Sequence, residues 1–253
     1  MADAGQFMLF TLILMRMSGF VLLNPILGRS NIPGIVRAGL MIVLTVIVFS
    51  YAGGTAEETK TALEYGALLL KEFFVGYALG VVVSLFMYVV LFAGEFMDNQ
   101  MGISMAKTYD PQSNSSISMS STLYNTMFMM LFFAVNGHLA LIRILLTSAE
   151  IVPYSGITVG PELSTHILAV FCECTVLAVK FAFPVFAGEF ICEIGMGILM
   201  KTIPQINVFV VNIQLKIVIG LLILLIMLSP MSEFLQELIT AMIDTMKGTL
   251  RLL

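Results

Sequence analysis

The sequence has little charge and no tryptophan. Only 11% of its 253 residues are charged, whereas soluble domains carry about a quarter. Apolar residues make up 59% of the chain, more than a soluble core of this size can hide, so the composition predicts a polytopic membrane protein. The net charge of −4 excludes a nucleic-acid binder on electrostatic grounds. Without tryptophan, the usual tryptophan belt at the lipid interface is missing, although tyrosine or phenylalanine can take its place.

Residues that carry enzymatic chemistry are also scarce. The three cysteines, at 172, 174 and 192, have no metal-binding spacing and are interpreted as small buried apolar residues. The two histidines, His138 and His166, belong to no Ser/His/Asp or H-E-x-x-H pattern, and no phosphate-binding or dinucleotide-binding glycine motif occurs. The sequence therefore predicts no enzymatic activity, no metal and no cofactor.

Long apolar stretches dominate what is present. Each is close to the ~20 residues that a helix needs to cross a bilayer. They are Phe7–Leu27, Ile35–Ala52, Phe73–Ala93, Leu123–Leu146, Ile167–Ala187 and Ile206–Leu228. After them, Phe234, Leu238, Met242 and Met246 recur every four residues opposite charged positions, which predicts an amphipathic helix over 231–253. We therefore expect an all-α, polytopic membrane fold of about six bent apolar helices or helical hairpins, followed by this helix, in a single domain over 1–253.

Charged residues lie inside several of these stretches, where each costs at least ~2.5–3.5 kcal/mol at the bilayer centre. They are Arg16, Arg143, Glu173, Lys180 and Lys216. The basic residues in the loops divide equally between the two sides of the membrane, so the positive-inside rule gives no orientation. Two explanations stay open: the charges face a polar or water-filled interior, or the helices pack against other subunits. In either case, we expect these side chains to pair with opposite charges.

A short sequence occurs twice. Residues 92–96 and 186–190 both read FAGEF, either through an internal duplication or by chance. Each copy predicts a corner where a helix ends in a small residue followed by acidic ones. The corner residues are Gly94, Glu95, Asp98 and Gly102 in the first copy, and Gly188 and Glu189 in the second. The carboxylates are candidates either for a proton relay or for helix caps and ion pairs.

A methionine stripe leads into a serine-rich segment. Met97, Met101 and Met105 share a helix face and precede Lys107–Ser121, which contains six serines and the turn signal Asp110-Pro111. Core filling is one explanation for the methionines. The other is a soft closure for a channel, because methionine adapts to varied partners.

The segment MKTIPQINVFVVNIQLKI (200–217) is too polar for a lipid-facing helix. We interpret Pro204 as a bend between two helical pieces. Gln205 and Asn207, together with Asn212 and Gln214, would then form hydrogen bonds with neighbouring helices. This segment is expected to be a subunit interface first and a membrane segment second.

Several motifs in order resemble the family of FliR, a subunit of the flagellar type III export gate, and SctT, its injectisome counterpart. The resemblance covers essentially the whole chain. It is carried by GRSNIP (28–33), GEFMDNQMGISMAKTYDP (94–111), VNGHLALI (135–142), FAFP (181–184) and GILMKTIPQINVF (197–209). Two positions depart from the common family pattern: Leu139 stands where a second histidine is usual, and Lys201 where arginine is common.

The resemblance implies a non-enzymatic, multi-pass gate subunit of the flagellar basal body in the bacterial inner membrane. It implies assembly with FliP-like, FliQ-like and FlhB-like proteins, contact with lipid, and transient contact with unfolded export substrates. The segment 104–121 would be a pore plug. The residues implied in the plug and its gating are Met101, Met105, Tyr109, Asp110, Pro111, Ser113, Ser116 and Ser118.

Two other functions stay open at this point. One is the homologous subunit of a virulence injectisome. The other is a proton-coupled secondary transporter that uses Glu173 and Lys180 as a relay.

Overall fold

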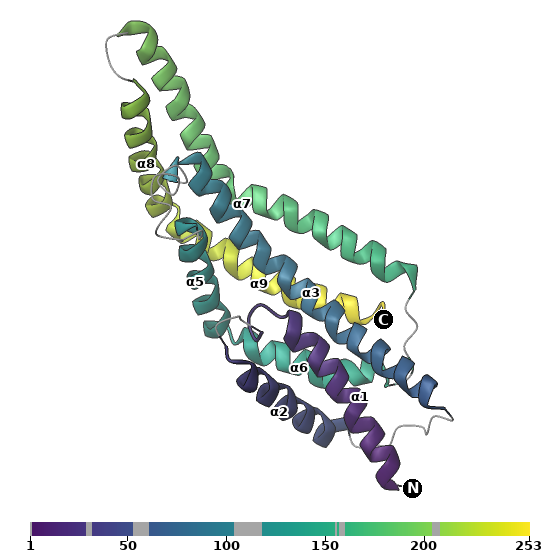
Figure 1. The fold of residues 1–253 in the computed structure, drawn as a ribbon. Helices are drawn as coiled ribbons and strands as arrows, with labels where there is room; N and C mark the ends of the chain where they lie inside the picture. The colour runs from purple at the N-terminus through teal and green to yellow at the C-terminus, as the bar shows by residue number, and fades with distance from the viewer. Residues whose placement is uncertain are drawn as a thin grey trace. The chain divides into compact units, whose positions relative to one another are not determined.

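Helices form every regular element that the computed structural model describes (Figure 1). The described residues are 2–28, 32–52, 61–103, 118–154, 156, 160–203 and 208–253. The helices are α1 (Ala2–Leu23), α2 (Gly34–Ala52), α3 (Ala62–Gln100), α5 (Met119–Ala134), α6 (Gly137–Ile151), α7 (Pro161–Thr202), α8 (Val208–Ile226) and α9 (Leu228–Leu250). The predicted all-α polytopic fold is confirmed.

Four of the described helices are long and apolar enough to cross a membrane: α1, α2, α3 and α7. Two bent pairs, α5 with α6 and α8 with α9, also qualify if each pair is taken as one span, which brings the total to six. Since α3 has 39 residues and α7 has 42, both are about twice as long as a simple crossing requires. The apolar stretches thus located these two helices but not their full length.

The predicted stretch Leu123–Leu146 is not one helix. It breaks between α5 and α6, where Asn136 adopts a left-handed conformation with φ 58°. Asparagine tolerates this conformation better than most residues. Hydropathy did not reveal the break because the residues on both sides of Asn136-Gly137-His138 are apolar.

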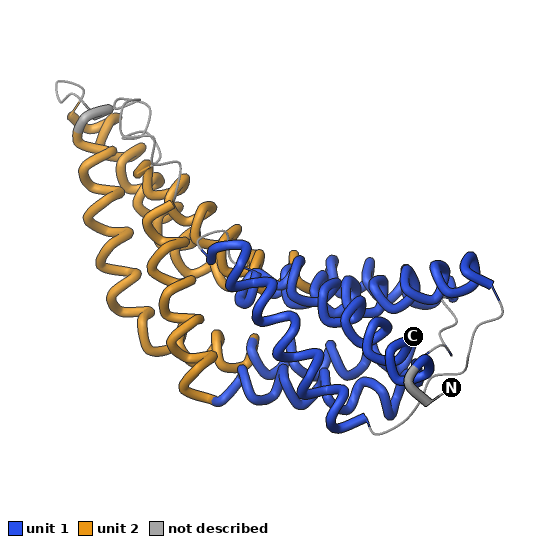
Figure 2. Tube along the Cα trace, turned by 60° about the horizontal axis from the view of Figure 1, so that its bottom comes forward, with its two compact units in different colours: residues 1–86, 136–172, 239–253 blue, residues 87–135, 173–238 orange. Residues whose placement is uncertain are grey.

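The helices form two compact units, each built from separate parts of the chain (Figure 2). Unit 1 comprises residues 1–86, 136–172 and 239–253, and unit 2 comprises 87–135 and 173–238. The long helices α3 and α7 each contribute residues to both units.

In unit 1, α1 and α3 pack with their backbones in contact. A Cβ added at Gly76 would collide with the carbonyl oxygen of Arg16, and one added at Gly19 would collide with that of Phe73. Such close approach needs glycine on both helices, and it is a common way to pack helices in membranes. By contrast, α2 contacts α1 and α6 along a narrow face, since only 17% of its span-length window is buried, against 61% for α3. The rest of α2 presents apolar side chains for lipid or other subunits to cover.

In unit 2, aromatic side chains join three helices. The Tyr124 ring of α5 meets Phe181 of α7 edge-on, with centroids 4.9 Å apart, and Phe181 lies 5.0 Å from Phe234 of α9. Such aromatic pairs contribute about 0.5–1.5 kcal/mol beyond the area they bury. They hold α5 and α7, which carry residues of the site described below, against each other and against α9.

The C-terminal helix has the predicted amphipathic pattern and begins at Leu228, slightly before the expected residue 231. Its stripe residues Leu238, Met242, Met246 and Leu250 are buried within this chain. The helix therefore uses this stripe to pack against its own protein.

Candidate functional site

The connection 104–117 between α3 and α5 has two well-defined ends, both in unit 2. At the first end, α3 stops at Gln100, and Gly102 takes a left-handed conformation with φ 77°. The backbone N–H of Met101 still donates to the carbonyl of Met97 at 2.9 Å. A glycine in this conformation is a usual way to terminate a helix.

At the second end, Asp98 caps the start of α5. Its carboxylate accepts hydrogen bonds from the Ser118 hydroxyl at 2.7 Å, the Met119 N–H at 2.6 Å and the Ser120 N–H at 3.2 Å. Asp98 is completely buried. The unpaired N–H groups and positive dipole at the start of a helix stabilise a carboxylate placed there. One buried side chain of α3 thus fixes where α5 begins.

Ser118 is the N-cap of α5, because its Oγ accepts a hydrogen bond from the Ser121 N–H at 3.1 Å. Helix α5 starts at Met119, so the last residues of the expected plug segment 104–121 belong to a helix. Gly94 lets the two helices approach, since a Cβ there would collide with the Ser121 backbone. Ser121 also donates its hydroxyl to the Leu91 carbonyl at 2.7 Å.

A second cluster lies beside the end of α3. The side chains of Met101 and Glu189 are both completely buried, and both lie against Gly220 of α8. A Cβ at Gly220 would collide with the Met101 sulfur and lie 2.9 Å from Glu189 Oε1. Within the part of the chain that the structure describes, neither oxygen of Glu189 accepts a hydrogen bond.

The neighbouring turns carry an ion pair and a close contact. Lys216 of α8 pairs with Glu193 of α7, and Gly188 lies against the Ile223 side chain. The glycines of the two FAGEF copies thus have similar roles: Gly94 faces the helix that follows it, α5, and Gly188 faces α8. The copies themselves contact each other, with the Phe96 and Phe186 rings 6.0 Å apart.

Arg16 forms the polar centre of unit 1. Its Nε donates to Glu72 of α3 at 2.7 Å, and both side chains are completely buried. Its other nitrogens donate to the Ser148 hydroxyl at 3.2 Å and to the Val152 carbonyl, at the end of α6, at 3.0 Å. One guanidinium therefore links α1, α3 and α6.

Tyr154, which follows α6, packs against the same guanidinium, with Arg16 Cζ 4.3 Å from its ring centroid. Burial raises the pKa of Tyr154 above the usual value for a phenol. The Arg16 cation offsets part of this rise and the Glu72 carboxylate adds to it. The ring is therefore neutral at physiological pH, and its face packs against the guanidinium of the ion pair as a cation–π contact.

The other charged residues that were expected to form buried pairs do not do so among the described residues. Arg143, Glu173 and Lys180 lie exposed and form no ion pair with another described residue. The burial expected for these three side chains is therefore not found among the described residues. Glu95 is also exposed.

One prediction about helix corners is wrong. Gly188 and Glu189 lie inside α7, which continues to Thr202, whereas Gly94, Asp98 and Gly102 do lie near the end of α3. The residues that follow Glu189 are mostly apolar and continue the helix. The remaining predicted positions fall outside the described residues: Met105, Tyr109, Asp110, Pro111, Ser113, Ser116, Pro204, Gln205 and Asn207.

Sequence reasoning missed Glu72, Gly76 and Gly220. Two signals in the sequence point to the first two. An arginine inside an apolar stretch requires an acidic partner, and Gly76 and Gly80 have the small-x-x-x-small spacing of closely packed helices. Nothing in the sequence pairs Gly220 with Met101.

Comparison with known proteins adds to this geometry. The model of the family described as "Bacterial export proteins, family 1" matches residues 7–242. The chain belongs to this family. It is 30% identical over 250 residues to the flagellar biosynthetic protein FliR of Bacillus subtilis (strain 168), covering 96% of this chain and 95% of that one.

Two further relatives extend the comparison. The flagellar biosynthetic protein FliR of Escherichia coli (strain K12) is 25% identical over 230 residues, covering 89% of this chain and 86% of its own. The Yop proteins translocation protein T of Yersinia pestis is 25% identical over 220 residues, covering 86% of this chain and 84% of that protein. The resemblance to the FliR and SctT family is confirmed. This bacterial export protein is therefore a multi-pass membrane component of an export apparatus.

Proposed function

We propose that this export protein is a channel subunit of a flagellar type III export gate in the bacterial inner membrane, and that the connection 104–117 closes its pore. It would assemble with FliP-like, FliQ-like and FlhB-like proteins and pass unfolded flagellar proteins. Its matches to FliR along almost the whole chain support the flagellar assignment.

The observation that carries the pore-closing role is the cap formed by Asp98. The buried carboxylate on α3 binds the first residues of α5, so the start of α5 is fixed on α3 close to where that helix ends. In this proposal the segment opens and closes between two fixed ends, so the helices that hold these ends need not unfold. This property suits a plug that yields to a substrate and then closes again.

We predict that deleting residues 113–117 opens the pore. The deletion keeps Ser118 and therefore the cap of α5. In cells that overproduce the gate subunits together, passive ion leakage across the inner membrane should rise several-fold over that of the unaltered gate. The reason is that the segment shortened by the deletion would no longer fill the pore. Unchanged leakage from a normally assembled gate would contradict the plug assignment.

A second variant in the same assay tests the anchor. Asp98→Ala removes a capping interaction that contributes about 0.5–2 kcal/mol, so leakage should again increase. Asp244→Ala is the matched control, since Asp244 is exposed and its one ion pair among the described residues is with Lys247 on its own helix, at 2.9 Å. The control should not leak.

The Yersinia relative favours a second candidate, an injectisome gate, because that protein is named for the translocation of Yop proteins. A deletion of the gene distinguishes the two systems. Loss of motility with intact effector secretion would support the flagellum, and the reverse would support the injectisome.

A further inference from the structure

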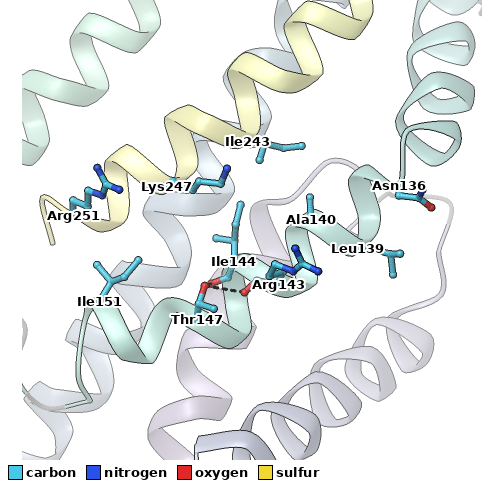
Figure 3. Close-up of a pocket in the computed structure, with 10 residues that line it drawn as sticks. All are labelled: Asn136, Leu139, Ala140, Arg143, Ile144, Thr147, Ile151, Ile243, Lys247 and Arg251. Atoms are coloured by element: carbon cyan, nitrogen blue, oxygen red, sulfur yellow. Dashed lines mark hydrogen bonds between the residues drawn. The ribbon is translucent and has the colours of Figure 1, made fainter.

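A groove of about 460 Å³ lies between α6 and α9 in unit 1 (Figure 3). Apolar side chains form much of its lining, among them Leu139, Ile144 and Ile151 of α6 and Ile243 of α9. Leu139 is 55% exposed and Ile151 is 42% exposed. This surface is therefore apolar and uncovered within the chain.

Three basic side chains also line the groove: Arg143 from α6, and Lys247 and Arg251 from the end of α9 (Figure 3). Ile243 and Lys247 are four residues apart and therefore share one face of α9, and Arg251 lies in the turn directly after that helix. No acidic residue lines the groove. The charged residues that line the groove are therefore all basic.

Internal pairing accounts for only one of these charges. Lys247 pairs with Asp244, which is exposed on the same helix, and a cation near the end of a helix also interacts favourably with the helix dipole. Neither explanation applies to Arg143, which lies in the middle of α6. Arg143 and Arg251 form no ion pair with any other residue in the described ranges.

The groove contains few other polar side chains that could form hydrogen bonds with a ligand. Thr147 already donates its hydroxyl to the carbonyl of Arg143 at 2.9 Å. A bound peptide needs partners for its own N–H and C=O groups, whereas a lipid needs cations for its phosphate and apolar walls for its acyl chains. Basic pockets between the helices of membrane proteins bind anionic headgroups in this way.

We propose that the groove between α6 and α9 binds an anionic phospholipid. The phosphate lies on Arg143, Lys247 and Arg251, and an acyl chain lies along the isoleucines. The lipid covers apolar surface that the chain leaves exposed, and its negative charge neutralises the unpaired arginines. This role does not depend on whether the connection 104–117 closes a pore.

The test uses the chain in complex with its co-produced gate subunits, purified in a neutral detergent. Phosphatidylglycerol is titrated against phosphatidylcholine, and bound lipid is counted by native mass spectrometry. Arg143→Gln with Arg251→Gln is compared with Lys180→Gln and Lys201→Gln, which remove the same charge from exposed positions of α7. We expect the first pair to weaken phosphatidylglycerol binding about twenty-five-fold, because each basic residue near a lipid surface contributes about a fivefold factor. The control pair and phosphatidylcholine binding should be unaffected.

Three results would overturn the proposal. One is equal phosphatidylglycerol binding by both double variants. Another is binding of inorganic phosphate with the same affinity as the lipid. The third is cross-linking of the groove to an acidic segment of a gate subunit in a complex that holds no phosphatidylglycerol.

Discussion

Replacing Gly76 with alanine should destabilise the protein by about 3 kcal/mol or more, at the upper end of the cost of overpacking a core. The added Cβ would meet the backbone carbonyl of Arg16, which cannot rotate away as a flexible side chain can. Helices α1 and α3 would have to separate, and the hydrogen bonds between them would lengthen. Because the chain has no tryptophan, unfolding is best followed by circular dichroism during titration with a denaturing detergent.

The same helix provides a matched control. Gly66 also lies in α3, but a Cβ at that position would meet nothing within 4 Å. Gly66→Ala should therefore stabilise the protein by about 0.5–1 kcal/mol through the better helix propensity of alanine. If both alanine variants had the same stability, the close packing of α1 on α3 would be wrong.

Breaking the buried ion pair should have a comparably large effect. Arg16→Met or Glu72→Leu alone should cost about 3–5 kcal/mol of the free energy of unfolding, because each removes one member of a completely buried ion pair. The double variant Arg16→Met/Glu72→Leu should recover most of this loss, because apolar residues of similar volume often replace a buried pair without cost.

A double-mutant cycle measures this recovery directly, using the same detergent titration. The coupling energy should be several kcal/mol. Purely additive losses would mean that Arg16 acts mainly through Ser148 and Val152, and that its contact with Glu72 contributes little. Arg143→Met is the control for the loss of an arginine, since Arg143 is exposed in this chain and should have little effect on its stability.

The class of fold was predictable because membrane helices leave a strong apolar signal. The spans of α1 and α2 follow from the length of their apolar stretches. The amphipathic stripe of α9 follows from the four-residue spacing of its apolar residues. The length of α3 was not predictable, because its first turns carry Glu64, Lys71 and Glu72 and look like a polar loop. Glu72 nevertheless lies in a buried part of the helix, where its carboxylate accepts a hydrogen bond from Arg16.

The candidate site was predictable only in part. The sequence singled out Asp98, Met101 and Glu189, but it could not show that Asp98 binds the start of α5 or that Met101 and Glu189 share the space left by Gly220. These contacts join residues that are far apart in the sequence and depend on how the helices pack. The charges at Arg143 and Lys180 are exposed and form no ion pair with another described residue, so the sequence-based expectation of a buried partner for each was not met among these residues.

The central claim is that the connection 104–117 lies in the path of exported proteins. A photo-reactive amino acid at Ser116 tests it in living cells, with a substrate stalled in the gate by a folded domain that cannot pass. We expect a cross-link to the stalled substrate from Ser116, and none from the same amino acid at Glu162, at the exposed start of α7. A gate that exports normally but gives no substrate cross-link from Ser116 would contradict the proposed role.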